Sequence, residues 1–247
     1  MGLSGLEGAP APKRSIIELR KLSMRNTADN QMQRTSDFLK SAALPALKRA
    51  GASTVGFFAP VIGEESPFIL ALAAFPSLAA METAREKEAA DAEYIRGRDT
   101  YNANAGLGYQ RLESSLLRCF EVMPNVEAPA DDGKRAARIF ELRTYESNNT
   151  VTLARKIKMF NEGEAGIFKK LGMQPVFFAE TIVGPKMPNL TYMLSFDDLA
   201  ARDRLWKAFG SDPEWQKLRT QPGYSDSEIV SNISNSILRP LSFSEIR

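Results

Sequence analysis

The chain has 247 residues, of which 43% are hydrophobic and 25% charged with a net charge of +2, a composition typical of a soluble globular protein with one large or two ordinary domains. Interspersed charges of both signs argue against nucleic acid as the main partner, and no run approaches the roughly 18 apolar residues of an integral membrane segment. Histidine is absent, which excludes His-ligated haem, zinc and iron and His-based catalytic dyads, so we expect no metal and no cofactor.

Residues 1–13 are rich in Gly, Ala and Pro and show no hydrophobic periodicity, so we expect a flexible N-terminal segment there. No basic region is followed by an apolar one, so no secretory signal is predicted. We therefore expect a soluble protein that is cytoplasmic, or exported if a signal peptide has already been removed.

The first half of the chain predicts six elements in the order β-α-β-β-α-β. They are a strand at residues 15–24, a helix near 31–49, strands at 54–62 and 68–74, a helix at 77–94 and a strand at 109–120. Pro45 lies inside the first helix and is expected to kink or break it. Cys119 is the only cysteine, lies in the last strand and is expected to be a buried, inert thiol.

The second half predicts the same order. Its elements are a strand at 138–146, a helix at 151–171, strands at 175–183 and 189–196, a helix from 199 through 209, a short helix at 214–219 and a strand at 228–239. Asp212 is expected to cap the short helix, with Trp215 anchoring that helix on the core. The expected boundaries are 14–123 for the first repeat, 124–137 for the linker and 138–247 for the second repeat.

After their first strands, the two halves align at a constant offset of 121 residues. Gly51 and Gly63 correspond to Gly172 and Gly184. Further matched pairs are Pro67 with Pro188, Phe75 with Phe196, Asp91 with Asp212, Tyr94 with Trp215, and Arg118 with Arg239. So many coincidences in one register indicate a tandem duplication.

The element order of each repeat is that of the ferredoxin-like unit, four antiparallel strands with two helices on one face. The bare face of such a sheet must be buried by something else. Two repeats in one chain can pack their sheets face to face. We therefore predict an α+β fold in which two tandem ferredoxin-like repeats form a closed or nearly closed barrel with the helices outside.

The opening strand of each repeat carries a Glu and an Arg two residues apart, Glu18 with Arg20 and Glu141 with Arg143. Residues two apart share a strand face, so each pair projects from one side, and Tyr145 shares the side of Glu141. Facing the barrel interior, the two pairs would bind a polar or anionic small molecule through bidentate arginine. The competing interpretation is a buried cross-strand ion-pair network that fixes the register of the sheets.

The second half resembles the NIPSNAP family. The resemblance rests on residues 138–145 (RIFELRTY), the Gly-Pro at 184–185, residues 189–192 (NLTY), residues 196–199 (FDDL) with Arg202, Trp206 and residues 211–215 (SDPEW). The first half is similar but weaker, so the resemblance covers about residues 14–247. It implies the dimeric α+β barrel fold. It implies little about chemistry, because relatives by fold include cofactor-free monooxygenases, haem-degrading enzymes and chlorite dismutases.

The leading hypothesis is a non-enzymatic module that binds a small molecule or another protein through the barrel cavity. The predicted ligand-binding residues are Glu18, Arg20, Glu141, Arg143, Tyr145, Asn189 and Tyr192, the last two at the barrel mouth. The alternative is an enzyme, a cofactor-independent monooxygenase or isomerase, which would need a closed cavity containing a carboxylate with few hydrogen-bond partners. Homo-oligomers are also expected, because such sheets and helices leave apolar surfaces to cover.

Overall fold

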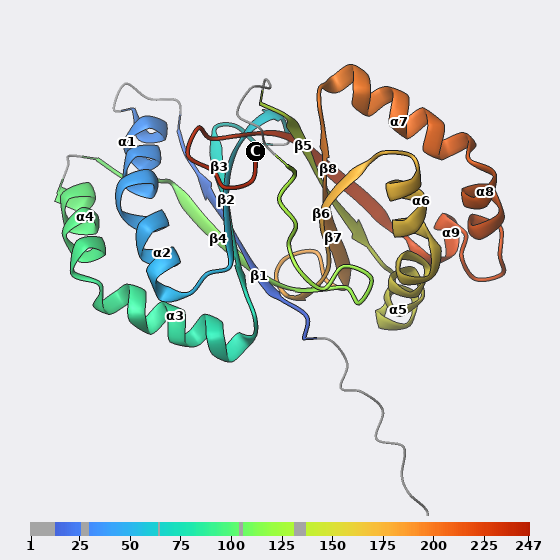
Figure 1. Ribbon diagram of the computed structural model, residues 1–247, viewed down its shortest axis with the longest axis horizontal. Coiled ribbons are helices and arrows are strands. Elements are labelled where there is room, and N and C mark those ends of the chain that lie inside the picture. Colours follow the sequence, from blue (N-terminus) through green and yellow to red (C-terminus); the bar gives the residue numbers. More distant parts are fainter. Residues whose placement is uncertain (1–12, 26–29, 64, 104–105, 131–136) are drawn as a thin grey trace, which may run out of the picture.

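Eight antiparallel strands close into a barrel in this protein, whose computed structural model describes residues 13–25, 30–63, 65–103, 106–130 and 137–247. The helices lie outside the barrel in two groups, one on each side (Figure 1). The N-terminal segment predicted to be flexible lies outside the described residues, apart from Lys13, and so does much of the predicted linker.

The secondary structure follows the predicted order in both repeats. The first repeat contains β1 (Ile16–Ser23), α1 (Gln31–Phe38), η1 (Leu39–Ala43), α2 (Leu44–Ala50), β2 (Thr54–Ile62), β3 (Phe68–Phe75), α3 (Leu78–Ala90), α4 (Ala92–Ala103) and β4 (Arg111–Cys119). The second contains β5 (Ile139–Glu146), α5 (Thr150–Met159), η2 (Phe160–Glu164), α6 (Ala165–Lys170), β6 (Gln174–Val183), β7 (Asn189–Phe196), α7 (Leu199–Ser211), α8 (Pro213–Arg219), α9 (Asp226–Ile229) and β8 (Asn232–Pro240).

The barrel is closed by strand pairs between the two repeats. Around the barrel the strands run β1-β3-β2-β8-β5-β7-β6-β4, so each repeat contributes four adjacent strands in the ferredoxin-like order. At the two seams β2 pairs with β8, and β4 pairs with β6. The predicted fold is confirmed, because every edge strand of one repeat is covered by an edge strand of the other.

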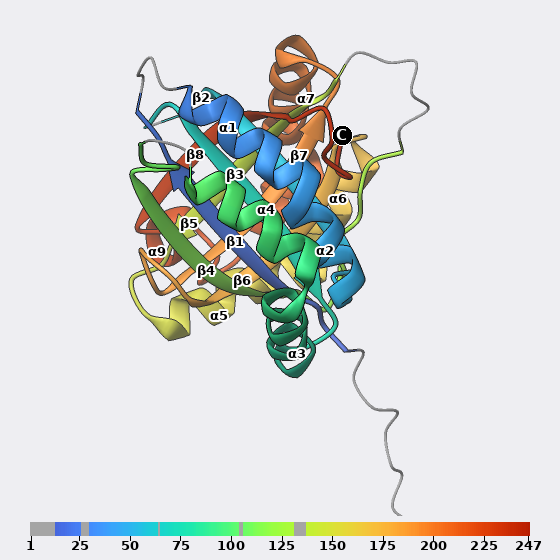
Figure 2. The ribbon, with the colours of Figure 1, turned by 90° about the vertical axis from the view of Figure 1, so that its left-hand side faces the viewer.

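The barrel interior is an apolar core that is sealed at one end. Large side chains from both repeats, such as Phe58, Phe140 and Met193, pack together inside. At the end where β2 and β6 begin, Val126 and Ile246 pack against this core. The outer face of the first repeat's sheet is covered by α1, α2 and α4 (Figure 2).

A π-helical segment interrupts the first long helix of each repeat. The two segments, η1 and η2, are separated by the repeat offset of 121 residues. The first half therefore shows the break expected at Pro45, but the second half shows the same break with Gly166 at the matching position. Proline is therefore not required for the interruption, which both repeats share.

At two places the structure has a helix that the sequence-based prediction did not contain. The last strand was predicted to begin at residue 228, but residues Asp226–Ile229 form α9, whose first turn is closed by a capping box between Ser225 and Glu228. In the first repeat, the predicted helix at 77–94 is two helices, because Asp91 ends α3 and accepts hydrogen bonds from the backbone N–H groups of Glu93 and Tyr94. The expected cap at Asp212 is observed, with the same geometry.

Close approach at the seams requires glycine at the residue that follows β6. A Cβ atom on Gly184 would lie 2.8 Å from Ser115 Oγ and 3.0 Å from Ser115 Cβ, across the β4–β6 seam. We expect Gly184→Ala to lower the free energy of unfolding by about 1–3 kcal/mol, because β4 and β6 must separate. Chemical denaturation measures this. Gly210→Ala is the control, since its new methyl group would meet nothing within 4 Å and would favour α7; equal stability of the two variants would contradict the expectation.

Candidate functional site

The Glu-x-Arg pairs lie on the outer face of the barrel, beneath the helices. Glu141 on β5 accepts hydrogen bonds from Arg202 and Trp206, both on α7. The expectation that these pairs line the barrel interior is wrong. The opposite face of β5 is the one that faces inward: Leu142 and Thr144 line the interior. Both faces of β5 are covered by protein, so each face carries apolar residues. The alternation of side chains along the strand therefore did not identify which face points into the barrel.

Glu141 is fully enclosed by hydrogen-bond donors. Its carboxylate accepts from Arg143 Nη1 at 2.8 Å, Arg202 Nε at 2.9 Å and Nη2 at 2.8 Å, Trp206 Nε1 at 2.7 Å and Asn235 Nδ2 at 3.1 Å. Burial alone would raise the pKa of Glu141, but these donors and the two cationic charges outweigh burial and lower it. This geometry matches the interpretation of the pair as a buried ion-pair network.

Tyr145 and Tyr192 also lie beneath the helices of the second repeat. The Tyr192 hydroxyl donates to the Tyr145 hydroxyl at 2.8 Å, and both rings are buried in an aromatic cluster with Phe160, Phe168 and Phe178. Burial raises the pKa of both phenols. The prediction that Tyr192 lies at the barrel mouth is therefore wrong, because its side chain is on the outer face of β7.

The first repeat has the same pair in the same register but different neighbours. Arg143 stands opposite Tyr192 on the neighbouring strand, and Arg20 stands opposite Ala71. Glu18 accepts from Arg20 Nε at 2.8 Å, and it is paired with Arg85 of α3, which occupies the position of Trp206 at the repeat offset. The charged pair is therefore retained in the first repeat, while the rings of Tyr192 and Trp206 beside it are replaced by the side chains of Ala71 and Arg85.

A cavity of about 260 Å³ occupies this place in the first repeat, between the helices and the outer face of the sheet. We call it the helix-side cavity. Its apolar wall is formed by Leu22, Phe38, Leu39, Ala43, Leu47, Val55, Phe57, Ala71, Leu72, Ala73 and Leu112. Its polar lining consists of Glu18, Arg20, Arg85, Glu88, Arg98 and Asn102, together with Tyr94, Tyr101 and Tyr109. It thus joins an apolar wall to a few charged groups, as small-molecule sites commonly do.

Two of the predicted site residues, Glu18 and Arg20, line the helix-side cavity, and sequence reasoning missed the others. Arg85 and Glu88 come from α3, more than 60 residues away from β1. A signal was nevertheless present in the repeat alignment, where Ala71 matches Tyr192 and Arg85 matches Trp206. Loss of large rings at matched core positions in one repeat points to empty space there.

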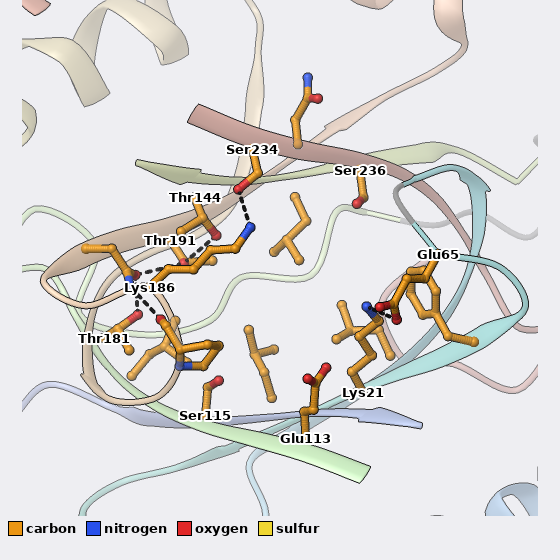
Figure 3. Close-up of a pocket in the computed structure, with 18 residues that line it drawn as sticks. Lys21, Glu65, Glu113, Ser115, Thr144, Thr181, Lys186, Thr191, Ser234 and Ser236 are labelled. Atoms are coloured by element: carbon orange, nitrogen blue, oxygen red, sulfur yellow. Dashed lines mark hydrogen bonds and ion pairs between the residues drawn. The ribbon is translucent and has the colours of Figure 1, made fainter. Parts of the chain in front are cut away.

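A second cavity, of about 320 Å³, opens at the end of the barrel opposite Val126 and Ile246 (Figure 3). We call it the barrel-mouth cavity. Hydroxyl groups are frequent in its walls, contributed by Ser115, Thr144, Thr181, Thr191, Ser234 and Ser236. Asn189 lies here as predicted, and its amide oxygen accepts from Thr181 Oγ1 at 2.6 Å.

The polar groups of the barrel mouth largely satisfy one another. Thr144 and Thr191 share a hydrogen bond of 2.9 Å, and Lys186 Nζ donates to Ser234 Oγ at 3.0 Å. On the other side of the mouth, Lys21 Nζ lies 2.8 Å from a carboxylate oxygen of Glu65 (Figure 3). Many polar groups of the mouth are therefore already paired with one another, and the mouth also carries apolar side chains such as Leu70 and Leu142.

An eight-stranded barrel built from two ferredoxin-like units with the helices outside defines the dimeric α+β barrel class. Within that class the chain belongs to the NIPSNAP family, whose sequence model matches residues 17–124 and 140–245. No curated protein matches the chain.

The comparison with solved structures gives matches at low sequence identity, two of which share this fold. A proposed monooxygenase from Lactobacillus acidophilus is 10% identical with a TM-score of 0.62, covering 92% of this chain and 94% of its own. A second proposed monooxygenase, from Fusobacterium nucleatum, is 7% identical with a TM-score of 0.59 and 93% coverage of both chains. A NIPSNAP family protein of unknown function from Agrobacterium tumefaciens is 21% identical, covers 45% of this chain and 95% of its own, and has a TM-score of 0.40. The likeness to the two proposed monooxygenases concerns the fold alone.

Among the described residues, no helix has the length and apolar character needed to cross a membrane.

Proposed function

We propose that this protein binds a small molecule in the helix-side cavity of its first repeat. One observation carries the proposal: the first repeat is hollow where the second repeat, built on the same strand register, is packed with aromatic rings. Protein interiors are normally packed to the density of organic crystals, so a cavity of this size beneath the helices is a departure that ligand binding accounts for.

The charges around the cavity favour binding over catalysis. An acid or base catalyst needs a carboxylate with few partners, but Glu18 accepts hydrogen bonds from Arg20 Nε and from Ser114 Oγ at 3.4 Å, and it is paired with Arg85. Arg85 also pairs with Glu88, which is buried. These groups form a compensated network that can orient a ligand, and none of them is an unpaired carboxylate poised to take a proton.

We expect Ala71→Tyr to abolish ligand binding, because it restores the ring that the second repeat has at the matching position, Tyr192, and fills the helix-side cavity. The measurement is a thermal-shift screen of wild type against a metabolite library, followed by titration calorimetry of each hit with the variant. The control is Ser236→Tyr, which introduces the same side chain at the barrel mouth.

A hit that Ala71→Tyr eliminates and Ser236→Tyr retains is the expected result. A hit with the reverse pattern would place the ligand in the barrel mouth and overturn the proposal. A screen in which no compound raises the melting temperature of wild type would remove its support as well. Circular dichroism of both variants shows whether a lost response reflects a lost fold.

A further inference from the structure

We infer that the ligand of the helix-side cavity is a small aromatic compound with an oxygen acceptor, whose ring lies where the second repeat has the ring of Tyr192. This inference rests on the proposed function and adds the chemical class of the ligand. Its basis is the internal duplication, which shows in the second repeat what a filled version of the same space contains.

The strand registers place the missing ring. On β1 and β3, Glu18 stands opposite Ala73 and Arg20 opposite Ala71. On β5 and β7, the matching pairs are Glu141 with Leu194 and Arg143 with Tyr192. The two Glu-x-Arg pairs therefore occupy equivalent positions in the strand register, and the side chain that the first repeat lacks opposite its arginine is a phenol ring.

The surroundings of that position remain suited to a ring. In the second repeat the Tyr192 ring centroid lies 5.8 Å from that of Phe178, and the first repeat keeps a phenylalanine, Phe57, at the matching position on β2. Other rings around Tyr192 are replaced by aliphatic side chains, with Leu39 for Phe160 and Leu47 for Phe168. These exchanges enlarge the space while leaving it apolar.

The arginine of the first repeat lacks its aromatic partners. The Arg143 guanidinium carbon lies 4.6 Å from the Trp206 ring centroid and 5.4 Å from that of Tyr145. At the matching positions beside Arg20, the first repeat has Arg85 and Leu22. Arg20 lines the cavity, so a planar ligand ring that also extends over its guanidinium would make a cation–π contact of the kind that Arg143 makes with Trp206 and Tyr145.

The polar lining calls for an oxygen acceptor on the ligand. The charged side chains in the lining are three arginines and two glutamates, an excess of one positive charge. A neutral or singly anionic ligand therefore fits, and a hydroxyl, carbonyl or carboxylate oxygen on it would accept hydrogen bonds from the arginines of the lining.

The test compares an aromatic acid with its saturated counterpart. By titration calorimetry, 4-hydroxybenzoate is expected to bind the full-length protein at least tenfold more tightly than 4-hydroxycyclohexanecarboxylate, and Ala71→Tyr is expected to abolish binding of both. Arg20→Met keeps a long apolar side chain and removes the cation, so it should reduce the preference for the aromatic acid to less than threefold.

The outcomes separate this inference from the function on which it rests. Equal affinity for the two acids, with both lost in Ala71→Tyr, would overturn the aromatic inference and leave the cavity as a binding site. The same conclusion follows if neither acid binds but the metabolite screen yields an aliphatic compound whose binding Ala71→Tyr abolishes. If no compound at all depends on position 71, both proposals fail together.

Discussion

Replacing Glu141 by alanine is expected to lower the free energy of unfolding by about 3–5 kcal/mol, because it leaves the largely buried Arg143 without its counter-charge and removes the acceptor of several hydrogen bonds. Arg143 and Arg202 both form ion pairs with this carboxylate, and Trp206 Nε1 donates to it at 2.7 Å. Denaturation by guanidinium chloride, monitored by far-UV circular dichroism, measures the loss.

The matched control is Glu18→Ala in the first repeat. The side chain of Arg20 is 36% exposed, against 13% for Arg143, so water can solvate the cation that the substitution leaves behind. Arg85 retains its ion pair with Glu88, just as Arg202 retains its ion pair with Asp203 in Glu141→Ala, so the difference between the variants rests on Arg20 and Arg143. Glu18→Ala should therefore cost clearly less than Glu141→Ala, and an equal or larger loss would contradict the account of the two pairs.

The stabilisation from Glu141 is also expected to depend on pH. Its pKa is lowered in the folded protein despite burial, which by itself would raise it, because of the hydrogen bond from Arg202 and the charge of Arg143. A lowered folded-state pKa gives stabilisation that is present above the ordinary value of 4.5 and is lost as the pH falls below it. The stability difference between wild type and Glu141→Gln should therefore shrink with acidification; a difference that grows would be inconsistent with this sign.

Glu164→Ala is expected to destabilise the second repeat by a similar amount, about 3–5 kcal/mol, because it leaves a buried ammonium group without its counter-charge. Lys156 Nζ lies 3.0 Å from Glu164 Oε2, and the two side chains are only 1% and 2% exposed. The more distant carboxylate of Asp226, at 3.8 Å, is half exposed and cannot replace Glu164. Urea denaturation of wild type and variant gives the difference.

The first repeat supplies the control for this pair. At the repeat offset, Lys156 and Glu164 correspond to Thr35 and Ala43, so the same helix tolerates a neutral pair of residues at these positions. The double variant Lys156→Thr/Glu164→Ala is expected to recover at least half of the stability lost in Glu164→Ala. If the double variant is less stable than Glu164→Ala, the Lys156 side chain itself stabilises the helix, and the prediction that its uncompensated charge causes the loss is wrong.

Much of the fold could be predicted from the sequence because hydrophobic periodicity and capping residues indicate the same order of elements in both repeats. The observed bounds of β2 and β7 are those predicted, and Asp212 caps its helix as expected. The short helix α9 was missed because the apolar residues Ile229 and Val230 continue the pattern of the strand that follows. There the capping box outweighs β propensity, and only its Ser225–Glu228 spacing could have revealed the helix.

The candidate site was less predictable, for two physical reasons. Alternation showed that Glu141 and Arg143 share a face, but a barrel strand is buried on both sides, so it did not show which face looks inward. The partners of Glu141 also come from α7, about 60 residues further along the chain. The repeat alignment showed that Ala71 corresponds to Tyr192. Only the strand register showed that both residues stand opposite the arginine of the Glu-x-Arg pair.

The covalent fusion of the two repeats has a consequence for how such a barrel can diverge. In a barrel assembled from two identical chains, any substitution is made twice, so a small residue at the position of Ala71 would open a hollow in both halves at once. Here the seams between β2 and β8 and between β4 and β6 join halves that are encoded separately. One half can therefore keep a dense aromatic cluster beneath its helices while the other half varies, and a symmetric pair of identical chains is unable to evolve this asymmetry.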